Sequence, residues 1–199
     1  MSRFIESMAL REGKLKLLEY HQERFERTRR EIFGLRKHPM LEELIEIPAG
    51  LEKGSYKCRV RYGRKIELIE LEPYRQREIH SLKLIQADTI DYPYKYADRS
   101  RLEELFRQRG PCDDILMFQN DLLTDSYIAN TVFRSNNAWF TPLKPLLPGT
   151  MRSYLLKSGQ ITEASIHTHD LEEFDAIRLI NALNPLAEAP EIPMESVHR

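Results

Sequence analysis

The segment Asp91–Arg99, with the sequence DYPYKYADR, places one lysine among three tyrosines near the middle of the chain. Lys95 lies between Tyr94 and Tyr96, and Tyr92 precedes all three. Aromatic surroundings remove water from an amine and favour its neutral form, and a neutral lysine amine can attack a carbonyl carbon. The segment is therefore a candidate for covalent catalysis, although a solvated lysine with its stem packed on apolar neighbours is the simpler interpretation.

The composition limits the kind of protein that carries this segment. The chain has 199 residues, of which 31 are acidic and 30 basic, so the net charge of -1 gives no electrostatic case for a nucleic-acid or membrane partner. No apolar run is long enough for a membrane span or for the apolar region of a signal peptide. Cys58 and Cys112 lack a metal-type spacing, so we expect reduced thiols in a cytoplasmic protein.

The first part of the chain alternates between apolar and polar residues in several short segments, which is typical of strands. Tyr62-Gly63-Arg64 joins two of these segments and favours a hairpin. The expected elements are strands at Arg3–Leu10, Leu15–Leu18, Ser55–Tyr62, Lys65–Glu72 and Glu78–Ala87, and helices at Glu19–Gly34 and Pro39–Ile47.

The second part mixes helices with short strands, and Asp88–Pro93 has the turn residues of a linker. We therefore predict an α+β fold with a small β-rich domain at residues 1–88 and a larger mixed α/β domain at residues 89–199. The expected elements of the second part are helices at Ser100–Gly110, 148–158 and Leu171–Phe174, and strands at Asp114–Phe118, Leu122–Thr124, Thr131–Arg134, Ala138–Thr141, Ile161–His167 and Ala176–Ile180.

Four short motifs carry most of the chemical information in the sequence. Lys95 is followed by Arg99 one helical turn later, residues 124–133 read TDSYIANTVF, residues 147–152 read LPGTMR, and residues 21–25 read HQERF. Singly, each motif has an ordinary structural explanation, because an acidic strand end is usually a turn residue and a Pro-Gly pair usually starts a helix. Their order along the chain is the informative feature.

The order and spacing of these motifs resemble the class IV aminotransferase family, the pyridoxal-phosphate enzymes of fold type IV. That family carries the motifs K-x-x-x-R, T-E-x-x-x-x-N-[LIV]-F, L-x-G-I-[TM]-R and H-x-x-R-[LM]. In this chain IES at residues 5–7 falls where the family has Phe-Glu-Thr, and INALNP at 180–185 is similar to a segment of the 4-amino-4-deoxychorismate lyase branch. The resemblance covers about Ile5 to Pro185 and implies a two-domain fold like that of D-amino-acid aminotransferase.

The resemblance assigns roles around the reacting end of pyridoxal 5'-phosphate. It implies that Lys95 carries the cofactor and moves protons at the substrate Cα. Asp125 stands in place of the glutamate that keeps the pyridine nitrogen protonated, and Asn130 belongs to the same cofactor-binding motif. Ser7 takes the place of a threonine near the substrate. Because aspartate is one methylene shorter than glutamate, either the ring sits deeper or a water bridges the gap.

The resemblance also implies a phosphate-binding set. Arg24 would hold the phosphate by a bidentate charged contact. Thr150 and Met151 lie at an expected helix N-terminus, where backbone N–H groups and the helix dipole favour an anion. Asn181 and Ala182 would border the phosphate from the last strand.

Three functions remain open from the sequence. The leading one is an enzyme like 4-amino-4-deoxychorismate lyase, which eliminates pyruvate and leaves 4-aminobenzoate for folate synthesis. The alternatives are an aminotransferase acting on D- or branched-chain amino acids and a non-catalytic relative, because the chain is identified as an N-terminally short member of the family. In each enzymatic case the resemblance implies an amino-acid-like substrate and a homodimer.

One pair of histidines falls outside these motifs. His167 and His169, in the sequence HTH, have the alternation of metal ligands on one strand face, but no third ligand follows at a useful spacing. The sequence therefore predicts a polar strand end and no metal site.

Overall fold

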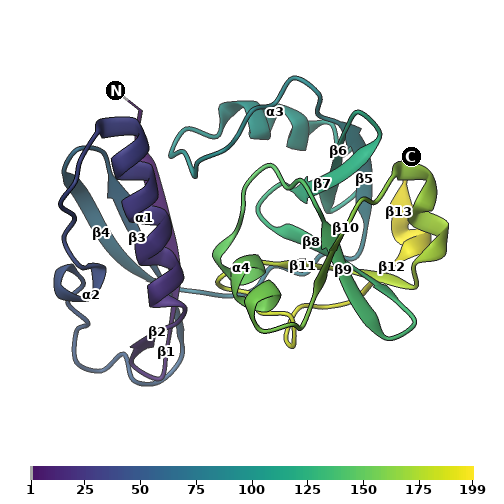
Figure 1. Ribbon diagram of the computed structural model, residues 1–199. Helices are drawn as coiled ribbons and strands as arrows, with labels where there is room; N and C mark the ends of the chain where they lie inside the picture. Colours follow the sequence, from purple (N-terminus) through teal and green to yellow (C-terminus); the bar gives the residue numbers. More distant parts are fainter. Residues whose placement is uncertain (1) are drawn as a thin grey trace. The chain divides into compact units, whose positions relative to one another are not determined.

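The computed structural model describes residues 2–199, which form two compact units (Figure 1). The first unit contains the chain up to Gln76 together with Tyr94–Asp98, and the second contains Arg77–Pro93 and Arg99–Arg199. Both units combine strands with helices, as the sequence predicted. The expected domain boundary after residue 88 stays a prediction; the strand before it, β5 (Leu82–Gln86), pairs with a strand of the second unit.

The first unit is an antiparallel sheet with the strand order β2-β1-β3-β4 and a long helix across one face (Figure 1). Its elements are β1 (Phe4–Arg11), β2 (Lys14–Leu15), α1 (Leu18–Phe33), α2 (Leu41–Leu44), β3 (Ser55–Tyr62) and β4 (Ile66–Pro73). The buried core between α1 and the sheet consists of Phe4, Met8, Phe25, Leu41, Ile45, Cys58, Val60 and Tyr62.

Two elements of this unit differ from the expectation. The second strand is shorter than expected, because Leu17 adopts a left-handed backbone conformation with φ 54° and α1 begins at Leu18. The helix expected at Pro39–Ile47 is a single turn, α2, with Ile45 already extended. The end of α1 follows the sequence, since Gly34 adopts φ 66° and its N–H bonds back to the helix carbonyls.

The second unit is built on a larger, mainly antiparallel sheet with the order β10-β9-β8-β7-β6-β5-β13 (Figure 1). Strand β11 pairs with β8 and with β12 outside this path, and β5 runs parallel to both β6 and β13. Besides β5, the strands are β6 (Asp114–Gln119), β7 (Leu122–Ser126), β8 (Asn130–Ser135), β9 (Ala138–Pro142), β10 (Thr162–Ala164), β11 (Ala176–Ile180), β12 (Ile192–Pro193) and β13 (Val197–His198).

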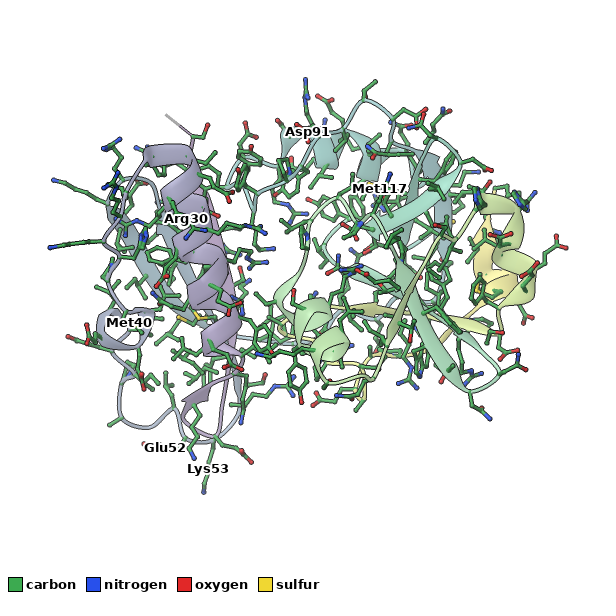
Figure 2. All side chains as sticks on the ribbon, in the orientation of Figure 1. Arg30, Met40, Glu52, Lys53, Asp91 and Met117 are labelled. Atoms are coloured by element: carbon green, nitrogen blue, oxygen red, sulfur yellow. The ribbon has the colours of Figure 1, made fainter. Side chains whose placement is uncertain are left out.

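Short helices and tight turns complete the second unit. Asn120 with Asp121, and Asn136 with Asn137, have positive φ angles, which are the conformations that join antiparallel strands through a two-residue turn. Met117 of β6, labelled in Figure 2, is one of the fully buried core side chains. The helices are α3 (Ser100–Arg107), α4 (Thr150–Lys157), and the 3-10 helices η1 (Thr168–Glu173) and η2 (Met194–Ser196).

The helices of the described chain are short or charged, and none of them combines the length and the apolar character that a membrane crossing requires.

Candidate active site

Glu6 is the centre of a buried polar cluster in the first unit. Along β1, Phe4, Glu6 and Met8 are fully buried and Ile5 and Ser7 are partly exposed, so Glu6 points to the core side of the strand and Ser7 to the other side. Its Oε1 accepts a hydrogen bond from Nε of Arg24 at 3.0 Å, and its Oε2 accepts from Nη2 of the same residue at 2.5 Å. The contact is therefore bidentate.

His21 completes this cluster from one helical turn before Arg24. Its Nδ1 lies 2.6 Å from Oε2 of Glu6, and the histidine side chain is fully buried. Residues three apart lie on the same face of a helix, which is why α1 delivers both side chains to one carboxylate. The bidentate face of Arg24 is thus committed to Glu6, so a bidentate grip on a phosphate would require this contact to be given up.

The cluster sets the charge of its members. Burial alone would raise the pKa of Glu6, but the Arg24 charge, the hydrogen bond from His21 and the positive charge that His21 can carry lower it to about 2. Burial lowers the pKa of His21, and the positive charges of Arg24 and Lys95 act in the same direction against the raising effect of Glu6. The imidazole is therefore neutral near pH 7 and donates its Nδ1–H to the ionised carboxylate.

Lys95 belongs to the first unit, in the short segment that returns to β1. Its carbonyl accepts a hydrogen bond from the N–H of Ile5 at 2.9 Å, and Tyr96 pairs with Phe4 in an antiparallel bridge. The rings of Tyr94 and Tyr96 lie 6.0 and 5.1 Å from the ring of Phe4, so both tyrosines pack on the core of this unit. Lys95 itself is partly buried, and it is close enough to His21 to affect its pKa.

Asp125 is the centre of a second polar cluster, in the second unit. It lies on β7, opposite Asn130 of β8, and only 5% of it is exposed. Its Oδ1 accepts from Nδ2 of Asn130 at 2.7 Å, and its Oδ2 accepts from the backbone N–H of Leu147 at 3.0 Å. Asn130 also donates to the carbonyl of Leu147 at 2.8 Å, so the two side chains fasten the loop before α4 to the sheet.

The charge of Asp125 is poorly compensated. Burial raises its pKa to about 6, against the lowering effect of hydrogen bonds from Leu147, Asn130 and Leu146 and of the more distant Arg152 charge. Within residues 2–199, no ion pair joins this carboxylate to a cation. Asp125 is therefore a buried carboxyl group that still lacks a positively charged partner in contact with it.

The motif LPGTMR places the start of α4 against this cluster. A Cβ atom at Gly149 would lie 2.1 Å from Oδ1 of Asn130, so only glycine allows this close approach. Thr150 and Met151 follow in the first helical turn and are both buried, and the N–H groups of a first turn lack acceptors within the helix.

Arg152, the last residue of the motif LPGTMR, makes contacts that stabilise the fold of the second unit. Arg152 donates to the carbonyl of Pro142 at 2.8 Å and to Oε1 of Glu163 at 2.8 Å, which ties α4 to the strands β9 and β10.

Asn181 and Ala182 lie just beyond β11, beside the Asp125 cluster. Ile180 pairs with Asn130 in the ladder between β11 and β8, which brings the following residues close to the start of β8. Oδ1 of Asn181 accepts from the N–H groups of Leu183 and Asn184 at 2.9 and 3.0 Å and so shapes the turn that contains Ala182. The second unit thus contains six of the expected cofactor-binding residues, namely Asp125, Asn130, Thr150, Met151, Asn181 and the partly buried Ala182.

Sequence reasoning missed two groups that the structure places in clusters. Glu6 and His21 lie within motifs that the sequence analysis quoted, but no role was assigned to either residue. Glu6 lies between Phe4 and Met8 on the apolar side of a strand, and a charged residue at such a position indicates a buried polar contact. Asp121 was the other: the structure brings it to His167 and His169 as the third group that the sequence did not supply.

Comparison with known proteins identifies the family. The sequence profile described as "Amino-transferase class IV" matches residues 3–192. The chain belongs to the class IV aminotransferase family. Proteins of this family are generally pyridoxal-phosphate-dependent enzymes, and the resemblance inferred from the motifs is confirmed.

Relatives of this class IV aminotransferase chain match it over nearly its whole length. A protein of Haemophilus influenzae is 37% identical over 188 residues, which are 94% of this chain and 100% of that protein. A crystal structure of a candidate 4-amino-4-deoxychorismate lyase from Haemophilus somnus is 33% identical, with a TM-score of 0.87, and covers 94% of this chain and 98% of that chain.

More distant structures confirm the fold alone. A candidate amino-acid aminotransferase from Mesorhizobium loti has a TM-score of 0.78 at 21% identity and covers 97% of this chain and 98% of that chain. A pyridoxal-phosphate-bound form of a hypothetical aminotransferase from Mycobacterium tuberculosis has a TM-score of 0.76 at 16% identity and covers 98% of this chain and 81% of that chain. The predicted fold type IV organisation is therefore confirmed.

The residues of the second unit suit the cofactor on which this family generally depends. Its ring nitrogen is cationic when protonated, and Asp125 is a buried carboxyl group that lacks a contacting cation. Its phosphate is an anion, and the first turn of α4 offers backbone N–H groups beside the close approach of Asn130 to Gly149. The donor set therefore fits the group at both ends.

Proposed function

We propose that this protein is a pyridoxal-phosphate-dependent lyase that acts like 4-amino-4-deoxychorismate lyase. The observation that carries the proposal is Asp125, whose buried carboxyl group has a pKa raised to about 6 and contacts no cation among residues 2–199. A protonated pyridine nitrogen would supply that missing charge. Such a pairing would lower the pKa of Asp125 and keep the ring in the protonated form on which the chemistry depends.

Each residue of the proposal has a defined physical role. When bound, the cofactor supplies a carbonyl carbon for the lysine amine and a ring that accepts electrons from the substrate carbon. Lys95 would hold the cofactor covalently, and its amine could accept and return a proton at the substrate Cα. Asn130 orients the Asp125 carboxylate through the 2.7 Å hydrogen bond. Ser7 offers a hydroxyl group to the substrate.

In this proposal the cofactor phosphate is bound mainly by residues of the second unit and less by Arg24. The first turn of α4, at Thr150 and Met151, would bind phosphate oxygens through backbone N–H groups, and Asn181 and Ala182 would border them. Arg24 would contribute one further charged contact while its bidentate face stays on Glu6.

The lyase reaction is favoured over transamination by the relative that is 33% identical over almost the whole of both chains and carries the lyase description. The proposed substrate, 4-amino-4-deoxychorismate, would lose its enolpyruvyl group as pyruvate and leave 4-aminobenzoate, a precursor of folate. Class IV relatives described as aminotransferases match at lower identity, so transamination is the outcome to test against.

Cofactor binding is tested by incubating the purified protein with pyridoxal 5'-phosphate, removing the excess and recording the visible absorption. Borohydride reduction followed by peptide mapping should then find the pyridoxyl group on Lys95. A label on another lysine would contradict the assignment, and no label at all would favour a non-catalytic relative.

The reaction itself is tested by following pyruvate and 4-aminobenzoate released from 4-amino-4-deoxychorismate. We expect equimolar pyruvate and 4-aminobenzoate without an added 2-oxo acid co-substrate, because elimination needs no amino-group acceptor. A requirement for a 2-oxo acid, with amino transfer to it from a D- or branched-chain amino acid, would overturn the lyase in favour of an aminotransferase.

We also propose that the protein is a homodimer, because small sheet domains gain burial from association. Light scattering across a range of concentrations measures the mass, and a constant monomer mass would contradict this part of the proposal.

A further inference from the structure

Three side chains with metal-binding atoms converge in the second unit, and none of them is among the residues assigned to the cofactor. They are Asp121, in the turn between β6 and β7, and His167 and His169, which flank the start of η1. One ligand atom from each of the three lies within 4.8 Å of the other two. The two histidines alternate along the chain, and the aspartate comes from a turn more than forty residues earlier.

The distances in this cluster match the coordination sphere of a small divalent ion. Oδ2 of Asp121 lies 3.5 Å from Nδ1 of His167 and 3.4 Å from Nδ1 of His169. Two ligand atoms about 2.1 Å from a tetrahedral zinc ion are about 3.4 Å apart. The same spacing is long for a direct N–H···O hydrogen bond, for which about 2.9 Å is usual. The carboxylate oxygen therefore lies from each of the two ring nitrogens at the separation expected for two ligands of one zinc ion, which is also within the range of an ion pair.

Further groups hold these ligands in the orientation that coordination needs. The hydroxyl of Thr168 donates to Oδ1 of Asp121, which leaves Oδ2 directed at both imidazoles. On His169, Nδ1 faces Asp121 while Nε2 lies 3.3 Å from Oδ1 of Asp170. A second carboxylate on the far nitrogen of a histidine is the arrangement that usually supports metal-binding imidazoles.

The backbone around the cluster is cross-linked, so the ligands are preorganised. The N–H of Thr168 donates to the carbonyl of Asp121 at 2.9 Å, and Leu122 pairs with His167 in an antiparallel bridge. The other oxygen of Asp170 accepts from the N–H of His167 at 2.7 Å and caps η1. The imidazole rings are nearly parallel, at 21° and 5.1 Å between centroids. Little ordering therefore remains to be done when an ion binds.

We propose that Asp121, His167 and His169 form a zinc site with water as the fourth ligand, which clips the turn between β6 and β7 to the segment before η1. Two imidazole nitrogens and one carboxylate oxygen suit Zn²⁺ better than Mg²⁺ or Ca²⁺, which prefer oxygen ligands. The ligands are partly exposed, with exposed side-chain fractions of 51% for Asp121, 41% for His167 and 70% for His169, so an ion can enter from solvent. The site is independent of the function proposed above.

The test is titration of the untagged full-length protein with Zn²⁺ in a calorimeter, after treatment with a chelator and its removal. We expect one ion per chain and a rise in the melting temperature on zinc addition, because an ion that binds only the folded state stabilises it. Replacing zinc by Co²⁺ should give the absorption bands of a four-coordinate ion. Absence of saturable binding up to about 1 mM Zn²⁺, the weakest affinity of interest, would overturn the proposal.

Three variants make the assignment specific. His169→Gln and Asp121→Asn should each weaken zinc binding by at least about tenfold, since each removes one of three protein ligands. Asparagine tolerates the left-handed backbone of position 121, where φ is 68°, so the turn is kept. His80→Gln is the matched control, because His80 is 76% exposed in the same unit and lies 3.8 Å from Glu78. Unchanged affinity in both ligand variants, or a loss in the control, would overturn the site.

Discussion

Each unit has a polar cluster centred on a buried carboxylate, Glu6 in the first unit and Asp125 in the second, and the pKa values of these two carboxylates are shifted in opposite directions. Glu6 is fully buried and has its pKa lowered to about 2, whereas Asp125 is 5% exposed and has its pKa raised to about 6. Burial acts in the same direction on both, because it always penalises the charged form of an acid. The difference lies in the partners: Glu6 contacts a guanidinium group, whereas the hydrogen-bond donors to Asp125 in the described part of the chain are neutral.

This difference suggests different roles: Glu6 is a structural carboxylate, whereas Asp125 is suited to bind a cationic group of a ligand. The charge of Glu6 is satisfied within the unit, so the Glu6 cluster stabilises the packing of α1 on β1. Asp125 is held in place by hydrogen bonds from Asn130 and Leu147, but these neutral donors do not offset the effect of burial, and its pKa stays raised. Perturbed carboxyl groups of the second kind concentrate at functional sites.

The largest expected effect is at Lys95, the one proposed catalytic lysine. Lys95→Ala should lower lyase activity by at least about a thousandfold, because it removes both the covalent carrier and the proton-transfer group. Turnover measured by pyruvate release checks this. Lys53→Ala, in an exposed loop of the same unit (Figure 2), should retain full activity. Comparable losses in both variants would contradict a special role for Lys95.

The next effect concerns the uncompensated carboxylate. Asp125→Asn removes the charge that would pair with the ring nitrogen, and losing a buried charge-assisted hydrogen bond costs about 2–4 kcal/mol, or roughly a thirtyfold to thousandfold drop in turnover. Asp125→Glu should be milder, because it keeps the charge. Turnover at saturating cofactor decides, with the melting temperature as a check on folding. Near wild-type turnover in the Asn variant would leave Asp125 with only its role of fastening the loop at Leu147.

The compensated carboxylate should matter for stability. Glu6→Gln keeps the side-chain size but leaves the Arg24 guanidinium without its buried counter-charge, so the free energy of unfolding should fall by about 3 kcal/mol. Urea denaturation at unchanged slope measures this. Glu42→Gln, at an exposed position of α2, is the control and should change stability by less than about 0.5 kcal/mol. Equal stability of the two variants would break the distinction drawn between the clusters.

The sequence predicted the elements whose signals are local. The hairpin of β3 and β4 followed from alternation on either side of Gly63, and the end of α1 followed from Gly34. The strand expected at Ile161–His167 is only Thr162–Ala164, because the residues after it form backbone hydrogen bonds with the turn at Asp121 and begin η1. Such partners lie far away in the sequence, so the pattern of residues could not reveal where this strand stops.

The same distinction applies to the clusters. Asp125 and Asn130 are five residues apart in one motif, so their proximity could be anticipated from sequence. Glu6 meets His21 and Arg24 only through the packing of α1 on β1, and Asp121 meets His167 only through strand pairing. Both contacts depend on tertiary structure and carry no signal of fixed spacing. The pKa values follow from these contacts, so they too required the structure.

The smallest predicted effect is a pH dependence that compares the two carboxylates directly. The pKa of Glu6 is lower in the folded than in the unfolded protein, so its stabilising contribution is fully present above about pH 4.5 and is lost as the pH falls towards 2. The pKa of Asp125 is higher in the folded than in the unfolded protein, so the folded state binds the carboxyl proton of Asp125 more tightly. The stabilising contribution of this protonated group is therefore lost as the pH rises from about 4 through 6. Between pH 5 and pH 7, where the contribution of Glu6 to the free energy of unfolding hardly changes with pH, Asp125 should lower that free energy by about 1 kcal/mol in the cofactor-free protein.

Urea denaturation of the wild type and of Asp125→Asn at both pH values isolates this contribution, because the variant lacks the titrating group while other groups titrate alike in both proteins. The wild type should therefore lose about 1 kcal/mol more than the variant over this interval. Saturation with pyridoxal 5'-phosphate should abolish the difference, since a cationic ring nitrogen would hold Asp125 ionised. An equal pH dependence of the two cofactor-free proteins would mean that Asp125 is already compensated, and the contrast with Glu6 would then fail.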